Sequence, residues 1–384
     1  MRKNLRCNYD GTDLYMIVAT QPVQRPAKAR LLVIDHDRKI HHVRRASFVD
    51  YLHAGDLVIA NDAATLPASL HGVHVTTGDA IEVRLAGRPS LRPEDINYFT
   101  AVVFGAGDFR TRTEDRLPPP KLAVGEKIIL GPLHATIEQL LGHARLVTLR
   151  FEGTADHVWA GLAHHGRPIQ YAHIATGLAL WDVWTRIAGP PVAFEPPSAG
   201  FALDWHTLSQ MRERGIEFET ITHAAGISST GDEELDRLLP LDEPYRIPEV
   251  TARAIQRTKK GSGRIVAVGT TVVRALEHSA RLDGRVRAGD GVATQRIGPS
   301  SRLRVVDAIL SGTHEPKTSH YELLRAFLDD ETLERASREL DKCNYLTHEF
   351  GDSVLIERVR KNLRGHHNPR PDTSYVRRKP LVKG

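Results

Sequence analysis

One segment, AVGTTVVRALE at residues 267–277, constrains the fold more than any other part of the chain. It continues an apolar run, Arg264 to Val268, that reads as a buried strand. Gly269 permits a tight turn, and the hydroxyl of Thr270 or Thr271 can cap the first amides of a following helix. Such amides can bind an anion or the polar edge of a ligand, although most turns of this kind are only architecture. A strand that passes directly into a helix predicts an α/β sheet.

The middle of the chain has a different pattern, in which short alternating runs are separated by turn residues such as Thr77-Gly78-Asp79. Strands of this length and spacing predict a small antiparallel β-barrel. The runs cover residues 71–75, 80–85, 99–104, 126–130, 134–138 and 145–152. We therefore predict a main α/β domain formed by residues 1–66 and 154–356, into which a β-barrel domain is inserted at residues 67–153.

The predicted main domain alternates between strand-like and helical patterns. The first 24 residues carry little regular pattern. Strands are predicted at 30–35, 39–43, 56–60, 216–222, 264–268 and 305–310. Helices are predicted at 48–52, 156–164, 205–214, 248–260, 271–281, 319–328 and 333–340.

The chain shows no targeting or membrane signal. No apolar run reaches 18 residues and the first residues lack a signal-peptide pattern, so a cytoplasmic location is expected. Cys7 and Cys343 lie far apart, which excludes a disulfide framework and a cysteine-rich zinc site. His71 and His74 would face opposite sides of a strand, and adjacent histidines rarely chelate one ion together. No metal is therefore expected.

Basic residues are concentrated at the carboxyl end of the chain. Residues 357–384 hold nine Lys or Arg and two Asp or Glu, a charge of 9 − 2 = +7. Because the whole chain carries +5, the remaining residues carry 5 − 7 = −2. An extended basic arm can hold RNA phosphates by counterion release, without reading their sequence. The alternative is a solvated tail that binds nothing.

Six motifs resemble those of one enzyme family, the S-adenosylmethionine:tRNA ribosyltransferase-isomerases of queuosine biosynthesis. The resemblance runs from about Arg25 to about Ile356 and is strongest in the AVGTTVVRALE and FGDSVLI motifs. The six motifs are GDLVIAND (55–62), PSAG (197–200), ITHAAG (221–226), AVGTTVVRALE (267–277), VVDAIL (305–310) and FGDSVLI (350–356). The family fold, an α/β domain interrupted by a β-barrel, agrees with the pattern described above.

The resemblance implies a particular reaction. The family transfers the ribosyl part of S-adenosylmethionine to the aminomethyl group of a 7-deazaguanine base in tRNA. The ribosyl part is isomerised to an epoxycyclopentanediol, and adenine and methionine are released. The resemblance thus implies S-adenosylmethionine as co-substrate, tRNA as partner and no metal; a monomer is expected. Because the sulfonium acidifies the protons on the ribose 5′ carbon, such a site needs a base with a pKa near 7.

His223 is the candidate base, because it ends a predicted strand and matches the histidine of the family's T-L-H-V-G motif. The alternative is a histidine that only satisfies a hydrogen bond at the strand end. Glu243 matches a family acidic residue and Arg274 lies on the helix after Gly269, so the resemblance implies that both act with His223. A helix arginine with a glutamate three residues on, here Glu277, is otherwise a surface ion pair of little value.

The resemblance also implies binding residues. Those expected to bind S-adenosylmethionine are Asn61, Asp62, Gly269, Thr270, Thr271 and Glu277. Those expected to bind the acceptor are Glu82, His314 and Ser319. The Asn61-Asp62 pair ends a strand, where ligands of α/β sheets usually bind, but an Asx pair there is equally suited to closing a turn.

Several positions depart from the family pattern, including Ser311-Gly312-Thr313 in place of T-N-F and Leu180 to Trp184 in place of a tyrosine-rich run. Ala64 and Ser69 stand where two arginines are expected, and Ala202 stands where a histidine is expected. Neither alanine nor serine can supply the planar donor fork of an arginine. These departures are typical of a divergent paralogue. Two other functions therefore stay open: a transferase that uses S-adenosylmethionine with a different acceptor, or a non-catalytic binding protein that keeps the fold.

Overall fold

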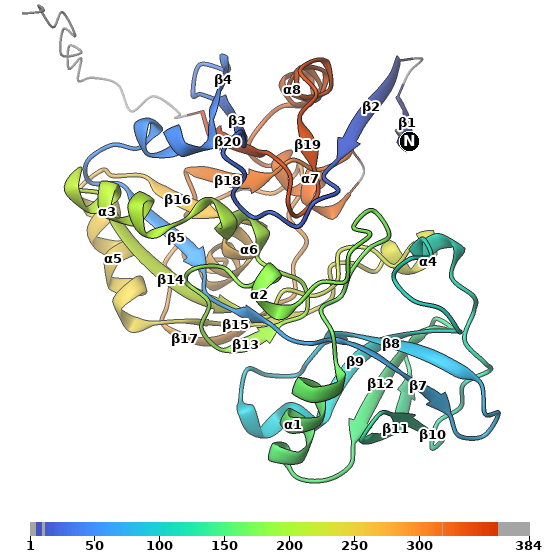
Figure 1. The fold of residues 1–384 in the computed structure, drawn as a ribbon. Coiled ribbons are helices and arrows are strands. Elements are labelled where there is room, and N and C mark those ends of the chain that lie inside the picture. Colours follow the sequence, from blue (N-terminus) through green and yellow to red (C-terminus); the bar gives the residue numbers. More distant parts are fainter. Residues whose placement is uncertain (1–4, 10–11, 317, 360–384) are drawn as a thin grey trace, which may run out of the picture.

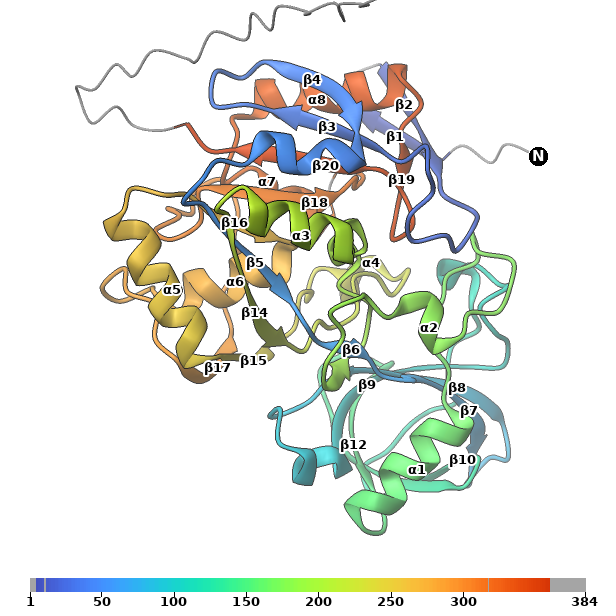
Figure 2. The same ribbon diagram turned by 60° about the vertical axis from the view of Figure 1, so that its left-hand side comes forward.

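The computed structural model describes residues 5–9, 12–316 and 318–359 (Figure 1). A large sheet covered by helices forms one part of the molecule and a small barrel forms the other. The barrel lies below the sheet in both views, which differ by a 60° turn, so the two parts are adjacent (Figure 2). The predicted basic tail falls outside the described residues from residue 360 onward. Among the described helices, none has the length and apolarity needed to span a bilayer.

The large sheet contains nine strands, and its central strands β14, β5, β16 and β18 are parallel. In spatial order the strands are β17 (Gly289–Ala293), β15 (Glu243–Ile247), β14 (Glu217–His223), β5 (Leu57–Asn61), β16 (Ile265–Val268), β18 (Ala308–Gly312), β20 (Ser353–Glu357), β3 (Arg30–Ile34) and β4 (Ile40–Arg44). All five residues of β5 are buried, because helices cover both faces of the sheet.

Alternate residues of β5 face different hydrophobic cores. Leu57 and Ile59 pack with α5 (Glu249–Lys260), α6 (Thr270–Ser279), α7 (Ser319–Leu324) and α8 (Asp330–Lys342). Val58 and Ala60 pack with the 3-10 helix η1 (Arg45–Tyr51) and with α3 (Trp205–Glu213). This alternation is the period-two arrangement of a strand buried on both sides.

Six antiparallel strands close into the barrel. Their order around it is β10 (Lys127–Leu130), β11 (Leu133–Leu140), β12 (Leu146–Phe151), β9 (Tyr98–Phe104), β8 (Ala80–Gly87) and β7 (Ser69–His74). Helix α1 (Ala155–His165) packs against the barrel, and the 3-10 helices η2 (Pro93–Asn97) and η3 (Thr113–Asp115) lie between its strands in sequence. The predicted combination of an α/β sheet with an antiparallel barrel is therefore confirmed.

Short elements connect the barrel to the sheet. After β5 the chain forms β6 (Ala64–Thr65), which pairs in parallel with β13 (Pro191–Ala193) on the return path. The barrel core is continuous with Ala224 and Ala225, which directly follow β14. The end of β14 is thus held against the barrel. The other connecting helices are α2 (Leu180–Val183), η4 (Ser198–Ala202) and α4 (Glu233–Asp236).

Two of the expectations about secondary structure were wrong. Residues 1–24 were expected to be irregular, yet β1 (Leu5–Tyr9) and β2 (Thr12–Val18) form an antiparallel pair, and β19 (Leu346–Thr347) extends it. Backbone pairing made this small sheet, and its mixed polar sequence gave little periodic signal. Helix α7 was expected to reach residue 328 but ends at Leu324, with the next residues forming turns.

Candidate functional site

His223 is the last residue of β14 and is completely buried. It pairs across the sheet with Tyr245 of β15, and the two rings are stacked with centroids 6.3 Å apart and planes at 5°. Within the described residues neither ring nitrogen has a hydrogen-bond partner. A buried imidazole without partners is costly unless a ligand supplies them. His223 therefore has the features of a group that meets a substrate.

Glu243 and Arg274 lie beside this histidine. The Oε2 atom of Glu243 is 3.5 Å from His223 Nε2, at an angle that makes no hydrogen bond. The same oxygen forms an ion pair with Arg274, and Oε1 accepts a hydrogen bond from the Gly226 amide at 2.6 Å. Arg274 also donates to the backbone oxygen of Ala293 at 2.9 Å. The structure thus brings together the three residues expected to be catalytic.

Burial sets the protonation of this cluster. Burial, and then the positive charge of Arg274, lower the pKa of His223 well below its usual value. Burial also raises the pKa of Glu243, and the Arg274 guanidinium opposes that rise. At neutral pH His223 is therefore uncharged, with a lone pair available to accept a proton.

Asn61 holds the end of β14 in place. Its side-chain oxygen accepts a hydrogen bond from the backbone amide of His223, and its side-chain nitrogen donates to the His223 carbonyl, both at 2.9 Å. The same nitrogen lies 3.4 Å from the hydroxyl of Thr271. Asp62 accepts hydrogen bonds from the hydroxyls of Thr220 and Thr222. Both residues therefore have structural tasks at the position where cofactor contacts were expected.

The turn between β16 and α6 is close to the predicted form. Gly269 has a φ of 96°, which favours glycine, and a Cβ atom there would lie 3.5 Å from Ala199 of the PSAG motif. Gly269 is itself the N-cap residue, and no side chain caps the helix. The expectation that a threonine hydroxyl caps α6 was therefore wrong, because the helix already begins at Thr270.

The carboxylate of Glu277 accepts hydrogen bonds from backbone amides. The donors are the amides of Arg304, Val305 and Val306, at 2.7, 2.9 and 3.0 Å. It thereby fixes the chain just before β18. These contacts give no support to the expectation that Glu277 binds a cofactor; they assign it to the fold.

Glu82 lies on the outer face of barrel strand β8, since Ile81 and Val83 on either side of it pack into the barrel core, and it is the centre of a buried ion-pair network. Its carboxylate forms ion pairs with Arg84 and Arg116 and accepts a hydrogen bond from the Ser69 hydroxyl at 2.8 Å. Burial alone would raise its pKa, but the two arginines hold the pKa of Glu82 at about 2. The position expected to hold an arginine thus carries Ser69 beside a carboxylate that two other arginines neutralise. Glu82 is 1% exposed, so its expected contact with an acceptor finds no support here.

His314 and Ser319 lie beside His320, and the charges that act on His314 are those of His320, His348 and Glu349. The His314 ring stacks on His320, with centroids 4.3 Å apart, and Ser319 begins α7 next to it. Burial, and then His320, lower the pKa of His314 well below its usual value. Burial lowers the pKa of His320 to about 4; the charge of Glu349 opposes this shift and that of Arg274 contributes to it. Both histidines are uncharged at neutral pH, and His320 lies within the electrostatic reach of Arg274.

A second polar cluster was not predicted from the sequence. We call His173, His348 and Glu349 the His–Glu cluster; the rings of its two histidines lie 4.6 Å apart. Beside it, Tyr171 stacks on His173 and donates a hydrogen bond to Glu195. Burial, and then the charge of Glu349, raise the pKa of Glu195 to about 7. No local sequence pattern predicts this cluster, because its residues come from separate parts of the chain.

A cavity of about 630 Å³ opens between the barrel and the segment that follows α1. It is lined by Ser69, His71, residues 107–111, residues 167 and 168, Gln170, Gly177 and Leu178. Two of the lining residues, Arg110 and Arg167, are exposed. The cavity and the His223 cluster share no residue.

Comparison with known proteins gives consistent relatives. A family model described as "queuosine biosynthesis protein" matches residues 15–356. The S-adenosylmethionine:tRNA ribosyltransferase-isomerase of Citrifermentans bemidjiense is 32% identical over 88% of this chain and 96% of its own length. The protein of the same name from Gloeobacter violaceus is 31% identical over 92% and 96%. The chain therefore belongs to the queuosine biosynthesis protein family.

Proposed function

We propose that this chain is an S-adenosylmethionine:tRNA ribosyltransferase-isomerase, which transfers and isomerises the ribosyl group onto a 7-aminomethyl-7-deazaguanine base of tRNA. The observation that carries the proposal is the His223–Glu243–Arg274 cluster, in which a buried, uncharged imidazole has no hydrogen-bond partner among the described residues. Relatives that cover nearly the whole chain carry this name. The proposed product is the epoxyqueuosine nucleotide, with adenine and methionine released.

In this proposal His223 removes a proton from the ribose 5′ carbon, whose acidity comes from the neighbouring sulfonium. The pair of Glu243 and Arg274 keeps the surroundings of His223 electrically balanced. S-adenosylmethionine binds where Gly269, Thr270 and Thr271 begin α6, close to Asn61 and Asp62. Because Asn61 contacts both His223 and Thr271, these two parts of the proposed site are held together.

The acceptor is proposed to contact His314 and Ser319, and the RNA around it to bind near the barrel. Arg110 and Arg167 line the cavity there, and arginine is well suited to phosphate contacts. Ser69, which departs from the family arginine, lines the same cavity. Arg110 forms an ion pair with Asp108, which also lines the cavity, so the two arginines and this aspartate give a net charge of 2 − 1 = +1 there. A tRNA substrate places the proposed enzyme in the cytoplasm.

The proposal is tested by incubating the purified chain with S-adenosylmethionine and tRNA that carries the aminomethyl base, and by measuring adenine by chromatography. Adenine release that requires this tRNA is expected. Release with a free nucleobase or nucleoside, but not with tRNA, would instead favour a different acceptor. Tight binding of S-adenosylmethionine without release in either case would favour a non-catalytic binding protein.

The double variant R110A/R167A is expected to bind tRNA more weakly, with a smaller dependence of affinity on salt, because two phosphate contacts are lost. Its affinity for S-adenosylmethionine should not change. Arg253→Ala on α5 serves as the control, because it also removes an exposed arginine. Filter binding over a salt series measures both. Equal slopes for all three proteins would show that the cavity does not bind RNA.

The pH dependence of adenine release follows from the state of His223. A general base must be uncharged, and burial keeps the pKa of His223 well below 6.5. The value of kcat/KM should therefore stay constant as the pH falls from 8 through 6.5, and decline only at clearly more acidic pH. A series of initial rates between pH 4.5 and 8 measures this. A decline centred at 6.5 or above would contradict the proposed environment of the base.

A further inference from the structure

The His–Glu cluster joins two distant segments of the chain. His173 lies between α1 and α2, whereas His348 and Glu349 lie between β19 and β20. Each residue offers one possible ligand atom, and these atoms all lie within 4.8 Å of one another. Two imidazole nitrogens and one carboxylate oxygen therefore lie close to one another.

Both histidines have an unpaired nitrogen there. The Nε2 atoms of His173 and His348 are buried and form no hydrogen bond within the described residues. Carboxylate oxygens lie near them but out of alignment: Glu349 is 3.4 Å from His173, and Glu315 is 3.4 Å from His348. A buried polar atom left without a partner costs about 1–3 kcal/mol. Each nitrogen therefore has a carboxylate at ion-pair distance but, in the described part of the chain, no hydrogen bond, and a bound cation would satisfy both nitrogens.

A small space lies beside two of the three residues. A cavity of about 10 Å³ is lined by His173 and Glu349, together with Tyr171, Glu195 and others, but not by His348. That volume is close to one water-sized sphere. Ligands bound to one ion at about 2.0–2.1 Å with tetrahedral angles lie about 3.4 Å apart. The distance between His173 Nε2 and Glu349 Oε2 has this value.

We propose that His173, His348 and Glu349 bind one divalent first-row transition-metal ion, such as Zn²⁺ or Fe²⁺. Imidazole nitrogen is a preferred ligand of these ions, and a two-histidine, one-carboxylate set leaves positions open for water or a further ligand. Glu315, beside His348, is placed to be that further ligand. The ion would tie residue 173 to residues 348 and 349. Binding of the ion does not depend on ribosyl transfer.

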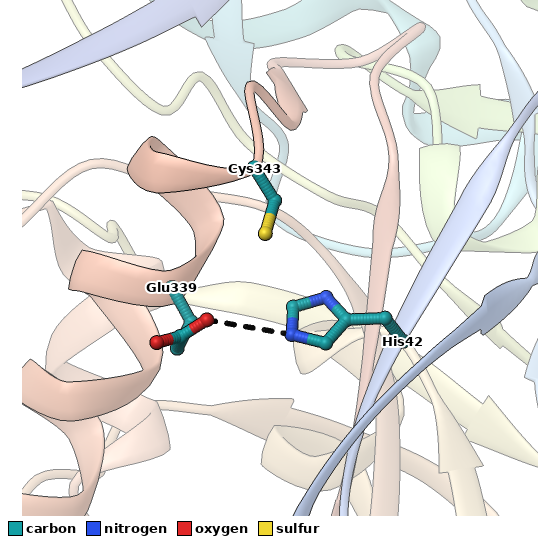
Figure 3. A group of neighbouring side chains, drawn as sticks. All are labelled: His42, Glu339 and Cys343. Carbon is teal, nitrogen blue, oxygen red and sulfur yellow. Dashed lines mark ion pairs between the residues drawn. The ribbon is translucent and has the colours of Figure 1, made fainter.

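A second group must be separated from this one in any experiment. Figure 3 shows His42, Glu339 and Cys343, whose possible ligand atoms also lie within 4.8 Å of one another. Here His42 Nε2 is 3.5 Å from Glu339, and its Nδ1 is 3.1 Å from the Tyr345 hydroxyl, so both ring nitrogens have neighbours. Both acid and imidazole are about one-third exposed. This group contains a thiol, which gives it a distinct optical signature when Co²⁺ binds.

The test uses the full chain without a histidine tag, carrying C343S so that the thiol group is removed. After treatment with a chelator, Co²⁺ is added and its visible absorption is recorded, and Zn²⁺ binding is measured by calorimetry. We expect a site with one equivalent of ion per chain. His348→Ala and Glu349→Gln should each weaken the binding of Zn²⁺ at least tenfold. His173→Gln, which is closer in size to histidine, serves as a third variant if His348→Ala does not fold.

The outcomes separate clearly. Loss of the site in the His348, Glu349 or His173 variants, with circular dichroism unchanged, supports the proposal. If the natural chain binds Zn²⁺ and the C343S chain does not, the ion belongs to the group in Figure 3 and the proposal is overturned. Absence of Zn²⁺ binding tighter than millimolar in the folded C343S chain would also overturn it. None of these results changes with the acceptor, so failure here is distinct from failure of the proposed function.

Discussion

Replacing His223 with alanine is expected to lower the rate of adenine release by a factor of about 10²–10⁴, the range typical for loss of a general base. The residue is fully buried, uncharged at neutral pH and lacks a hydrogen-bond partner among the described residues. Because the imidazole makes no hydrogen bond within the described structure, its removal breaks none and should leave the fold intact. The affinity for S-adenosylmethionine, measured by calorimetry, should change little, because the effect lies in proton removal.

His278 provides the matched control for this prediction. It is also a buried histidine beside Tyr245, and its Nδ1 lies 2.9 Å from the Tyr245 hydroxyl. Unlike His223, it has a hydrogen-bond partner among the described residues, so His278→Ala should cost stability but not turnover. If both variants lose adenine release equally, the loss comes from disturbance of Tyr245, and His223 is not the base.

Replacing Arg274 with methionine is expected to lower the free energy of unfolding by about 3–5 kcal/mol, because it leaves the Glu243 carboxylate buried without its cation. The double variant E243Q/R274M should recover most of that loss, since both charges are then gone. Glutamine at position 243 keeps an oxygen that can accept the hydrogen bond from the Gly226 amide. Urea unfolding followed by circular dichroism measures all three proteins.

Adenine release separates structure from catalysis in this series. The double variant should fold like the natural chain but remain inactive if the charged pair serves the site. An exposed pair, Arg246 and Asp290, gives the comparison: its nitrogen and oxygen are 2.6 Å apart, yet Arg246→Met should cost about 1 kcal/mol or less. A double variant as unstable as Arg274→Met alone would contradict the view that an unpaired charge causes the loss.

Much of the fold could be predicted because its signals are local. The apolar run that became β16 and the glycine turn before α6 are adjacent in sequence. The six barrel strands were predicted from alternation and turns, and their closure into a ring was confirmed. The pairing of β19 with β2 could not be predicted because more than 300 residues separate them, whereas the β1–β2 pair had a local sequence signal, Asp10-Gly11 between the two strands, that was missed.

The site was predictable only in part. His223 and Gly269 follow strands directly, so their place at one edge of the sheet could be read from sequence. The separation of Arg274 and Glu277 could not, because residues three apart on a helix differ by about 60° in direction. One meets Glu243 and the other meets the backbone amides before β18. The His–Glu cluster depends on a meeting of residues 173 and 348, which no spacing in the sequence records.

Asn61 extends the parallel sheet by one rung beyond its own backbone, since its amide group both accepts from and donates to the main chain of His223. Aspartate could not donate to that carbonyl, and glutamine would place the amide one methylene too far. Natural selection on the position of the base therefore acts on residue 61 as well as on residue 223. An asparagine preserved here across evolution would record the geometry of the sheet and not contact with a ligand.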